Sequence, residues 1–201
     1  MKNILLIVDP QNDFISGTLA VPKASEKMLE LTSYLKEKGH NYDYICITLD
    51  SHAINHCSFN TNGGIWPEHC IRYELGWHLP KYLTDVLNTY AHVKYYHKGT
   101  DIKNEEYSIF NNKQDGQILK NFLLDLSKKD QVFIDVCGIA GDYCVLETLK
   151  GLLEFIPSQY IFVLNEFIAS IDGGNSLNTY ITNKNINSIT DSSLNLTEYV
   201  R

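Results

Sequence analysis

The sequence lacks both a long hydrophobic segment and a basic tract. No apolar stretch approaches the roughly 20 residues that cross a bilayer. The N-terminal apolar run, residues 4–8, stops at Asp9, which is typical of a buried strand and not of a signal peptide. No run of Lys or Arg exceeds two residues, and the formal net charge is −7. These absences argue against nucleic acid or a membrane as the main partner.

The chain also lacks a cysteine framework. Its five cysteines are an odd number without regular spacing, and no Cys-x-x-Cys pair accompanies Cys144. This usage is typical of reduced thiols in the cytoplasm and argues against disulfides or a thiol-redox role. Nothing in the sequence fixes the oligomeric state, and a homo-oligomer is compatible with it.

Internal repeats, low-complexity tracts and linkers are absent too, and 44% of the 201 residues are hydrophobic. The sequence therefore predicts a single domain spanning residues 1–201. Apolar runs predict six strands, at 3–9, 43–49, 92–97, 131–137, 160–164 and 186–190. Helical periodicity between them predicts helices at 25–38, 79–88 and 118–126, after Gly141 and after Gly174, with Gly39 as a C-cap. This alternation predicts a three-layer, doubly wound α/β fold with a mostly parallel six-stranded sheet and helices on both faces.

The most distinctive stretch is residues 136–149. A β-branched run leads into the small-residue turn from Gly138 to Gly141, and a helical pattern follows with Cys144 in its first turn. A thiol there would face free backbone N–H groups and the positive end of a helix dipole, both of which favour thiolate. Taken alone, Cys144 is equally compatible with a half-buried packing residue.

Three other chemical side chains follow predicted strands: Asp9, Asp50 and Lys98. Since the carboxyl ends of parallel strands share one edge, these residues can converge with Cys144. Asp9 could take the thiol proton and later give it to a leaving amine, and Lys98 would lower the pKa of the thiol. The N–H groups of Ala140 and Cys144 could form an oxyanion hole. A structural salt bridge between Asp9 and Lys98 is compatible with this role.

The segment after the second strand holds a second group of candidates. Asp50 and His52, joined by His69, would give oxygen and nitrogen ligands with open positions for water or substrate. His56 is a possible fourth ligand. The set suits one divalent metal ion, and the sequence does not choose among zinc, iron and manganese. His40, His78, His92 and His97 are expected to be solvent-exposed.

Aromatic residues lie on the loops that would surround this site. Phe14, Trp66 and Tyr107 could clamp a flat ring, or they could anchor the loops to a small satellite core.

Together these residues resemble the nicotinamidase/pyrazinamidase branch of the isochorismatase-like cysteine hydrolases, and the match covers nearly the whole chain. The matching motifs are LLIVDPQNDF at 5–14, GTLAVP at 17–22, DSHAINHCSF at 50–59, WPEHC at 66–70, KGTD at 98–101, YSIF at 107–110 and GIAGDYC at 138–144. The chain departs from the usual family pattern at residues 71–76, where a Gly/Thr-Pro-Gly turn is common, and at Glu105 and Glu106.

The resemblance implies a catalytic triad of Asp9, Lys98 and Cys144 on an isochorismatase-like, Rossmann-like fold. It implies a metal on Asp50, His52 and His69, sometimes joined by His56, and a cis peptide between Ile139 and Ala140. The implied reaction is hydrolysis of nicotinamide, and of pyrazinamide, to the acid and ammonia through a thioester in NAD salvage. Phe14, Trp66, Tyr107 and Ile139 are the implied substrate-binding residues.

Two other functions stay open at the level of sequence. One is a superfamily amidase acting on a carbamoyl or ureido compound, against which the Asp50, His52 and His69 set argues. The other is a non-catalytic protein of the same fold that binds a metal or a ring ligand. It would bind without releasing ammonia.

Overall fold

A computed structural model describes residues 1–190, so the last part of the expected 1–201 domain lies outside the described residues. One parallel sheet has the strand order β3-β2-β1-β4-β5-β6. The strands are β1 (Lys2–Val8), β2 (Tyr44–Asp50), β3 (Val93–Lys98), β4 (Val132–Ile139), β5 (Ile161–Ala169) and β6 (Asn187–Ile189). The predicted six-stranded parallel sheet is confirmed.

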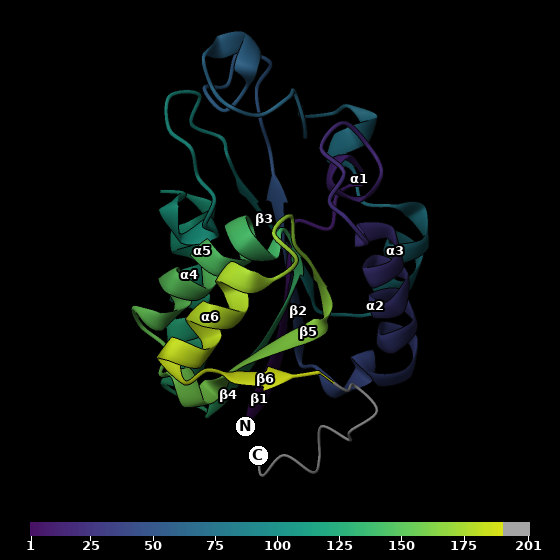
Figure 1. Cartoon of the computed structure of the whole chain (residues 1–201). Helices are drawn as coiled ribbons and strands as arrows, with labels where there is room; N and C mark the ends of the chain where they lie inside the picture. The colour runs from purple at the N-terminus through teal and green to yellow at the C-terminus, as the bar shows by residue number, and fades with distance from the viewer. Residues whose placement is uncertain (191–201) are drawn as a thin grey trace.

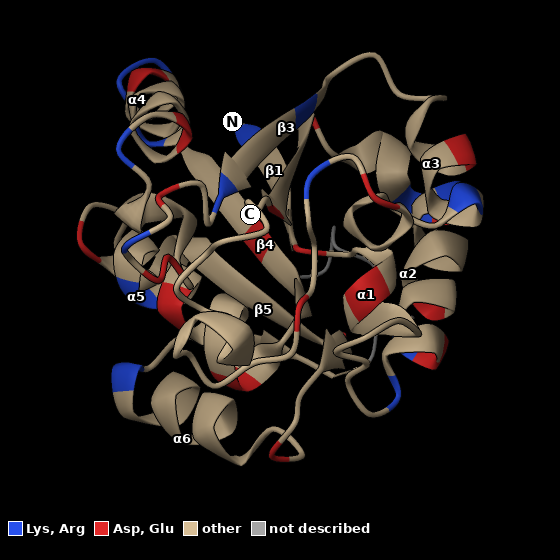
Figure 2. Ribbon diagram, turned by 90° about the horizontal axis from the view of Figure 1, so that it is seen from above, with Lys and Arg blue, Asp and Glu red and all other residues tan. Residues whose placement is uncertain are grey.

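Helices cover both faces of this sheet (Figure 1), and the view from above separates the two layers (Figure 2). The α-helices are α1 (Asn12–Ile15), α2 (Ala24–Lys38), α3 (Lys81–Leu87), α4 (Asp115–Ser127), α5 (Leu146–Leu153) and α6 (Asn175–Lys184). Single turns are η1 (Gly39–Asn41), η2 (Asn60–Asn62), η3 (Leu75–Trp77), η4 (Ile109–Asn111), η5 (Gly141–Val145) and η6 (Ser158–Tyr160). None of the helices within residues 1–190 is both long enough and apolar enough to cross a membrane.

Strand alternation builds one hydrophobic core on each face. In β1, Leu5 and Ile7 point to the layer of α1, α2 and α3, whereas Ile4, Leu6 and Val8 point to the layer of α4, α5 and α6. Both sets are at most 1% exposed. The central strands therefore read as continuous apolar runs, because successive side chains enter different cores.

Two elements differ from the prediction. The short helix α1 follows Asp9, where no helix was predicted, and β5 extends past 164 to Ala169 across a register shift between β4 and β5. The strand was predicted too short because the polar residues at 165–166 interrupt its apolar run. Gly39 is the C-cap of α2, as predicted, but its backbone is right-handed (φ −60°), so the turn itself does not require glycine. The close approach of Tyr90 requires it instead, since a Cβ there would overlap the Tyr90 ring.

Candidate active site

The four candidate strand ends converge, as predicted from the parallel sheet. Asp9, Asp50 and Lys98 lie at the carboxyl ends of β1, β2 and β3, and Cys144 lies in the turn after β4. Long loops rise from the same edge of the sheet, at the top of Figure 1. All four side chains are at most 5% exposed, so the site is withdrawn from bulk water.

Lys98 sits at the centre of this group. Its Nζ lies 2.9 Å from Asp9 Oδ2, 3.1 Å from Asp50 Oδ1 and 3.4 Å from Cys144 Sγ. Burial opposes the ammonium charge, but the Asp50 and Asp9 carboxylates outweigh it and raise the pKa of Lys98 well above its usual value. Lys98 therefore stays protonated and joins the thiol to both carboxylates.

Asp9 is positioned by the backbone as well as by its partners. Its φ of +46° lies in the left-handed region, which non-glycine residues rarely occupy. The Thr48 hydroxyl donates to Asp9 Oδ1 at 2.7 Å, which leaves Oδ2 for Lys98. Burial raises the pKa of Asp9, although Lys98 partly offsets the rise. A carboxyl with a raised pKa is suited to accept and return a proton near neutral pH.

The resting state of Cys144 differs from the sequence prediction. Burial raises the pKa of the Cys144 thiol well above its usual value; Lys98 lowers it, and the Asp9 and Asp50 carboxylates raise it further. The prediction that Lys98 lowers the pKa of the thiol is confirmed, but burial and the two carboxylates outweigh this effect. The thiol is protonated at rest, and its proton has to leave as the sulfur attacks.

The turn that carries Cys144 has two special features. The Ile139–Ala140 peptide is cis, as the family resemblance implied. Cys144 lies in a π-helical turn, η5, and the regular helix α5 begins only at Leu146, so the predicted first α-helical turn is wider than expected. Single π turns inside helices are frequent at functional sites. Ala140 and Cys144 both line the pocket described below.

Asp50, His52 and His69 form a compact group that could hold a divalent metal ion. One ligand atom from each residue lies within 4.8 Å of the others. His52 Nδ1 pairs with the Gly99 carbonyl at 3.0 Å and His69 Nδ1 with the Pro67 carbonyl at 2.7 Å. Both rings thus direct Nε2 toward Asp50 Oδ2, at 3.0 and 3.7 Å. Histidine ligands held through Nδ1 by backbone carbonyls are the usual arrangement in metal sites, so these residues fit a divalent cation.

The charge state of Asp50 also fits a metal ligand. Burial would raise its pKa, but His52 and Lys98 together hold the pKa of Asp50 well below its usual value. The carboxylate is therefore ionised over the whole physiological range and available to a cation. Lys98 contacts both Asp9 and Asp50, so the nucleophile group and the metal-ligand group share one ammonium.

His56 is not brought into the metal-ligand group. Its Nδ1 accepts the Ser58 N–H at 3.2 Å, and its ring lies 4.0 Å from the ring of His52, centroid to centroid. Burial lowers the pKa of His56, so the ring is neutral beside His52. The His56 ring thus packs on the ring of His52, and its Nε2 is buried without a hydrogen-bond partner in residues 1–190, so ligation by His56 stays a prediction.

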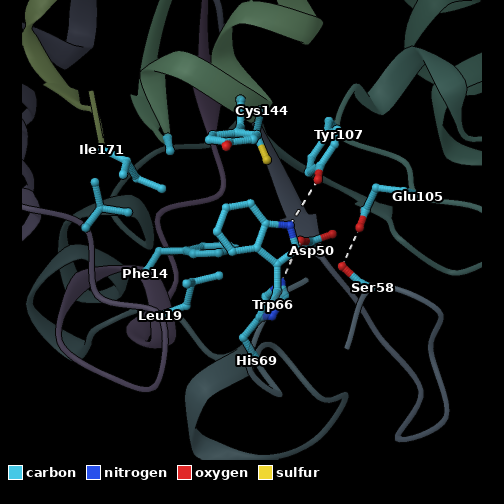
Figure 3. Close-up of a pocket in the computed structure, with 13 residues that line it drawn as sticks. Phe14, Leu19, Asp50, Ser58, Trp66, His69, Glu105, Tyr107, Cys144 and Ile171 are labelled. Carbon is cyan, nitrogen blue, oxygen red and sulfur yellow. Dashed lines mark hydrogen bonds and ion pairs between the residues drawn. The ribbon is translucent and has the colours of Figure 1, made fainter. Parts of the chain in front are cut away.

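A pocket opens above Cys144 and the metal-ligand group (Figure 3). As expected, Phe14, Trp66 and Tyr107 line it, and the Trp66 indole donates to the Tyr107 hydroxyl at 3.0 Å. The sequence did not identify the remaining wall residues: Leu19, Val21, Ser58, Glu105, Tyr143 and Ile171. Ile139, expected to bind substrate, does not line the pocket; it is 0% exposed and packs in the core, because it is the last inward-facing residue of β4.

Two polar residues that the sequence did not single out, the buried Gln11 and the half-buried Asp13, hold this architecture. Gln11 accepts the Asp50 N–H and donates to the Asp50 and Trp77 carbonyls, at 2.7, 2.8 and 2.9 Å, which fixes the end of β2. Asp13 Oδ2 accepts the Cys70 N–H at 2.7 Å beside His69. The sequence feature that could have identified them is the cluster of polar residues directly after β1. A polar side chain that is withdrawn from water usually has hydrogen-bond partners, so such a cluster indicates a structural role.

Replacing Gly99 with alanine is expected to weaken metal binding. Gly99 has φ +65°, and a Cβ there would overlap Asp50 Oδ1 and His52 Cε1. Disturbing the groups that hold metal-ligating side chains in position typically lowers metal affinity by about 10- to 100-fold. We expect a loss of this size in a zinc titration against a chromogenic chelator. Gly63→Ala is the matched control, because Gly63 also has positive φ (+92°) but no atom within 4 Å of a Cβ. Equal zinc affinities for the two variants would contradict this role of Gly99.

A buried thiol, carboxylate and ammonium beside a metal-ligand trio, at the carboxyl edge of a parallel sheet, define the chain as a cysteine hydrolase of the α/β class. No model of a known protein family matches the chain. Individual proteins do match. The chain is 30% identical to a nicotinamidase of Saccharomyces cerevisiae over 181 residues, covering 75% of this chain and 81% of the relative. It is 32% identical to a nicotinamidase/pyrazinamidase of Mycobacterium tuberculosis, covering 75% and 78%.

Solved structures agree with these relatives. The yeast nicotinamidase bound to the inhibitor nicotinaldehyde superposes with a TM-score of 0.81 at 26% identity, covering 94% of this chain and 100% of that one. The pyrazinamidase of Pyrococcus horikoshii in complex with zinc shares the fold, with a TM-score of 0.76 at 24% identity and coverage of 95% and 100%. The chain belongs to the nicotinamidase/pyrazinamidase family.

Proposed function

We propose that this protein is a metal-dependent nicotinamidase, which hydrolyses nicotinamide, and pyrazinamide as an analogue, to the carboxylic acid and ammonia. The observation that carries the proposal is the position of the Lys98 ammonium, which contacts Asp9, Asp50 and Cys144 at once. A carboxamide attacked by Cys144 would thus lie directly beside the metal-ligand group, which is where an aromatic nitrogen or a bound water would be held.

The chemistry follows from the protonation states. The Asp9 carboxylate takes the proton of the Cys144 thiol as the sulfur attacks the carboxamide carbon. The N–H groups of Ala140 and Cys144, which both line the pocket, would receive the developing oxyanion. Asp9 then returns the proton to the leaving nitrogen, ammonia departs, and a water molecule activated by Asp9 cleaves the thioester. Lys98 keeps its proton throughout and stabilises the negative charge that passes between sulfur and carboxylate.

The aromatic walls account for a flat heteroaromatic substrate. The cavity has a volume of only about 30 Å³, and in Figure 3 the Trp66 indole lies between Phe14 and Tyr107 across its centre. That is room for about one water molecule, so a pyridine ring enters only if wall side chains move. We propose that Trp66 is the one that moves, which would open its hydrogen bond to Tyr107. Trp66 then closes on the ring face opposite Phe14.

Asp50, His52 and His69 are the residues that would hold the metal, for which we propose zinc, with iron and manganese as alternatives. A divalent ion there supplies a Lewis-acid position for a ring nitrogen or a water molecule. We further propose a role in NAD salvage in the cytoplasm, with a small molecule and not nucleic acid or membrane as partner. A homo-oligomer is compatible with the proposal.

The test is ammonia release from nicotinamide by the fully metallated protein, measured beside an N-carbamoyl amino acid as the competing substrate class. We expect turnover of nicotinamide and little of the carbamoyl compound. The absence of ammonia release from nicotinamide would remove the proposed activity and leave only the fold and family.

Removing the metal is expected to abolish most of this activity without unfolding the protein. Asp50 keeps Lys98 as a partner when the cation is absent, so the site remains charge-compensated. Dialysis against a chelator should lower kcat/KM by at least about 100-fold, since an ion that positions the substrate contributes several kcal/mol. Zinc should restore it. Metal analysis must accompany the assay; full activity in a sample shown to be metal-free would exclude the metal from the reaction.

A further inference from the structure

A second cavity lies on the other side of the metal-ligand segment and shares no lining residue with the pocket above Cys144. Its volume is about 460 Å³, large enough for a small aromatic molecule. Arg72, Tyr73, Trp77, His97 and Asp115 are among its walls, and we refer to it as the Arg72 cavity. Ser51, the residue between Asp50 and His52, and Thr100, which follows Gly99, also reach it.

Arg72 supplies a cation without a protein partner. It is the only arginine in residues 1–190, it is half-buried, and within that range its guanidinium makes no ion pair or side-chain hydrogen bond. This is unusual in a chain with a net charge of −7. Asp115 also lines the cavity, but it interacts with His97 and not with Arg72. Its Oδ2 accepts the His97 backbone N–H at 2.7 Å and lies 3.3 Å from His97 Nδ1. The guanidinium fork is therefore available to a carboxylate.

Aromatic surfaces stand next to this cation. Trp77 stacks on His97 with ring centroids 5.8 Å apart and planes at 17°, and the Tyr73 ring lies 5.7 Å from Trp77. Tyr73 is 83% exposed, so its ring is not part of any core. His97 was expected to be simply exposed to solvent; it is instead half-buried between Trp77 and Asp115. Aromatic faces beside a single cation suit a planar ring that carries one negative charge.

The backbone holds Arg72 in place. Cys70 and Tyr73 on either side have φ of +46° and +72°, and left-handed backbone at such residues costs on the order of 1–3 kcal/mol each. The Arg72 N–H donates to the His52 carbonyl at 3.0 Å, and the His52 N–H donates to the Cys70 carbonyl at 3.0 Å. This short parallel bridge anchors Arg72 to a metal-ligand residue. It also falls in the segment, 71–76, where the sequence departs from the family pattern.

We propose that the Arg72 cavity is a second binding site, for a small planar aromatic carboxylate. Arg72 binds the carboxylate and the aromatic cluster of Tyr73 and Trp77 packs against the ring. Arg72 supplies the positive charge, and the only acidic side chain among the described lining residues, Asp115, accepts the His97 backbone N–H through Oδ2. The site stands apart from the proposed hydrolysis, and it would exist whether or not nicotinamide is the substrate.

Tryptophan fluorescence can test this directly, because the chain has only two tryptophans and Trp66→Phe leaves Trp77 as the sole reporter. Benzoate is the probe. Benzamide, which lacks the charge, and cyclohexanecarboxylate, which lacks the planar ring, are the comparisons. We expect a saturable change with benzoate and at least about 10-fold weaker binding of either comparison compound, as for a lost charge-assisted bond.

The decisive variant is Arg72→Met in the Trp66→Phe background. We expect it to weaken benzoate binding at least about 10-fold while its thermal unfolding midpoint stays unchanged. Lys113→Met is the matched control, since Lys113 is an exposed cation next to Asn112 that does not line the cavity. Benzoate binding that survives Arg72→Met, that Lys113→Met weakens equally, or that benzamide reproduces would overturn the proposal.

Discussion

Replacing Cys144 with alanine is expected to lower kcat for nicotinamide by at least about 10⁴-fold, the usual consequence of removing a covalent nucleophile. Cys144 is the only cysteine that lines the pocket among the described residues, and Lys98 Nζ lies 3.4 Å from its sulfur. KM should change little, because the aromatic walls and the metal-ligand group remain. Steady-state ammonia release measures both constants.

The control for this variant is Cys57→Ala. Cys57 is half-exposed and lies outside the pocket, so its loss should leave kcat within about 2-fold, as for a surface substitution away from special features. A trapping experiment strengthens the comparison: acid quenching during turnover should leave a thioester on the wild type and none on Cys144→Ala. Turnover that survives in Cys144→Ala would exclude the covalent route while leaving the metal-dependent part open.

The sequence predicted the site well because parallel α/β sheets impose a simple rule. Buried strands read as apolar runs, and the residue that follows each run must lie at the carboxyl edge. Asp9, Asp50, Lys98 and Cys144 could be brought together by that rule alone, and the structure does bring them together. The Asp50, His52 and His69 group followed from ligand chemistry and spacing.

The sequence could not predict properties that depend on packing in three dimensions. The direction of the Cys144 pKa shift is one example: a helix dipole and a lysine are visible in the sequence, but the degree of burial that outweighs them is not. The Nδ1 contact of His56 and the inward direction of Ile139 depend likewise on local backbone geometry. The Arg72 cavity is a further case, since residues from four separate segments form it.

Replacing Lys98 with methionine is expected to destabilise the metal-free protein by about 3–5 kcal/mol, besides abolishing activity. Lys98 is 0% exposed and is the ammonium partner of both Asp9 and Asp50. Methionine fills much of the same volume, so the cost does not come from a cavity. It comes from the lost counter-charge, which leaves Asp9 with only the Thr48 hydroxyl and Asp50 with only the two histidines among the described side chains. Urea unfolding in the presence of a chelator measures it, because a bound cation would itself compensate Asp50.

Lys2→Met is the matched control, because the Lys2–Asp43 pair is about one-third exposed and surface pairs contribute at most about 1 kcal/mol. Adding Asp9→Asn to Lys98→Met should recover part of the lost stability, since it removes the buried charge that has no other ionic partner within residues 1–190.

The pH dependence has a definite sign. Without Lys98 the pKa of Asp9 rises further above its unfolded value, whereas Asp50 keeps His52 as a partner. The folded variant therefore binds more protons, and its deficit relative to wild type shrinks as the pH falls. A deficit that matches Lys2→Met, or that does not change with pH, would mean that the ammonium does not hold these carboxylates in place.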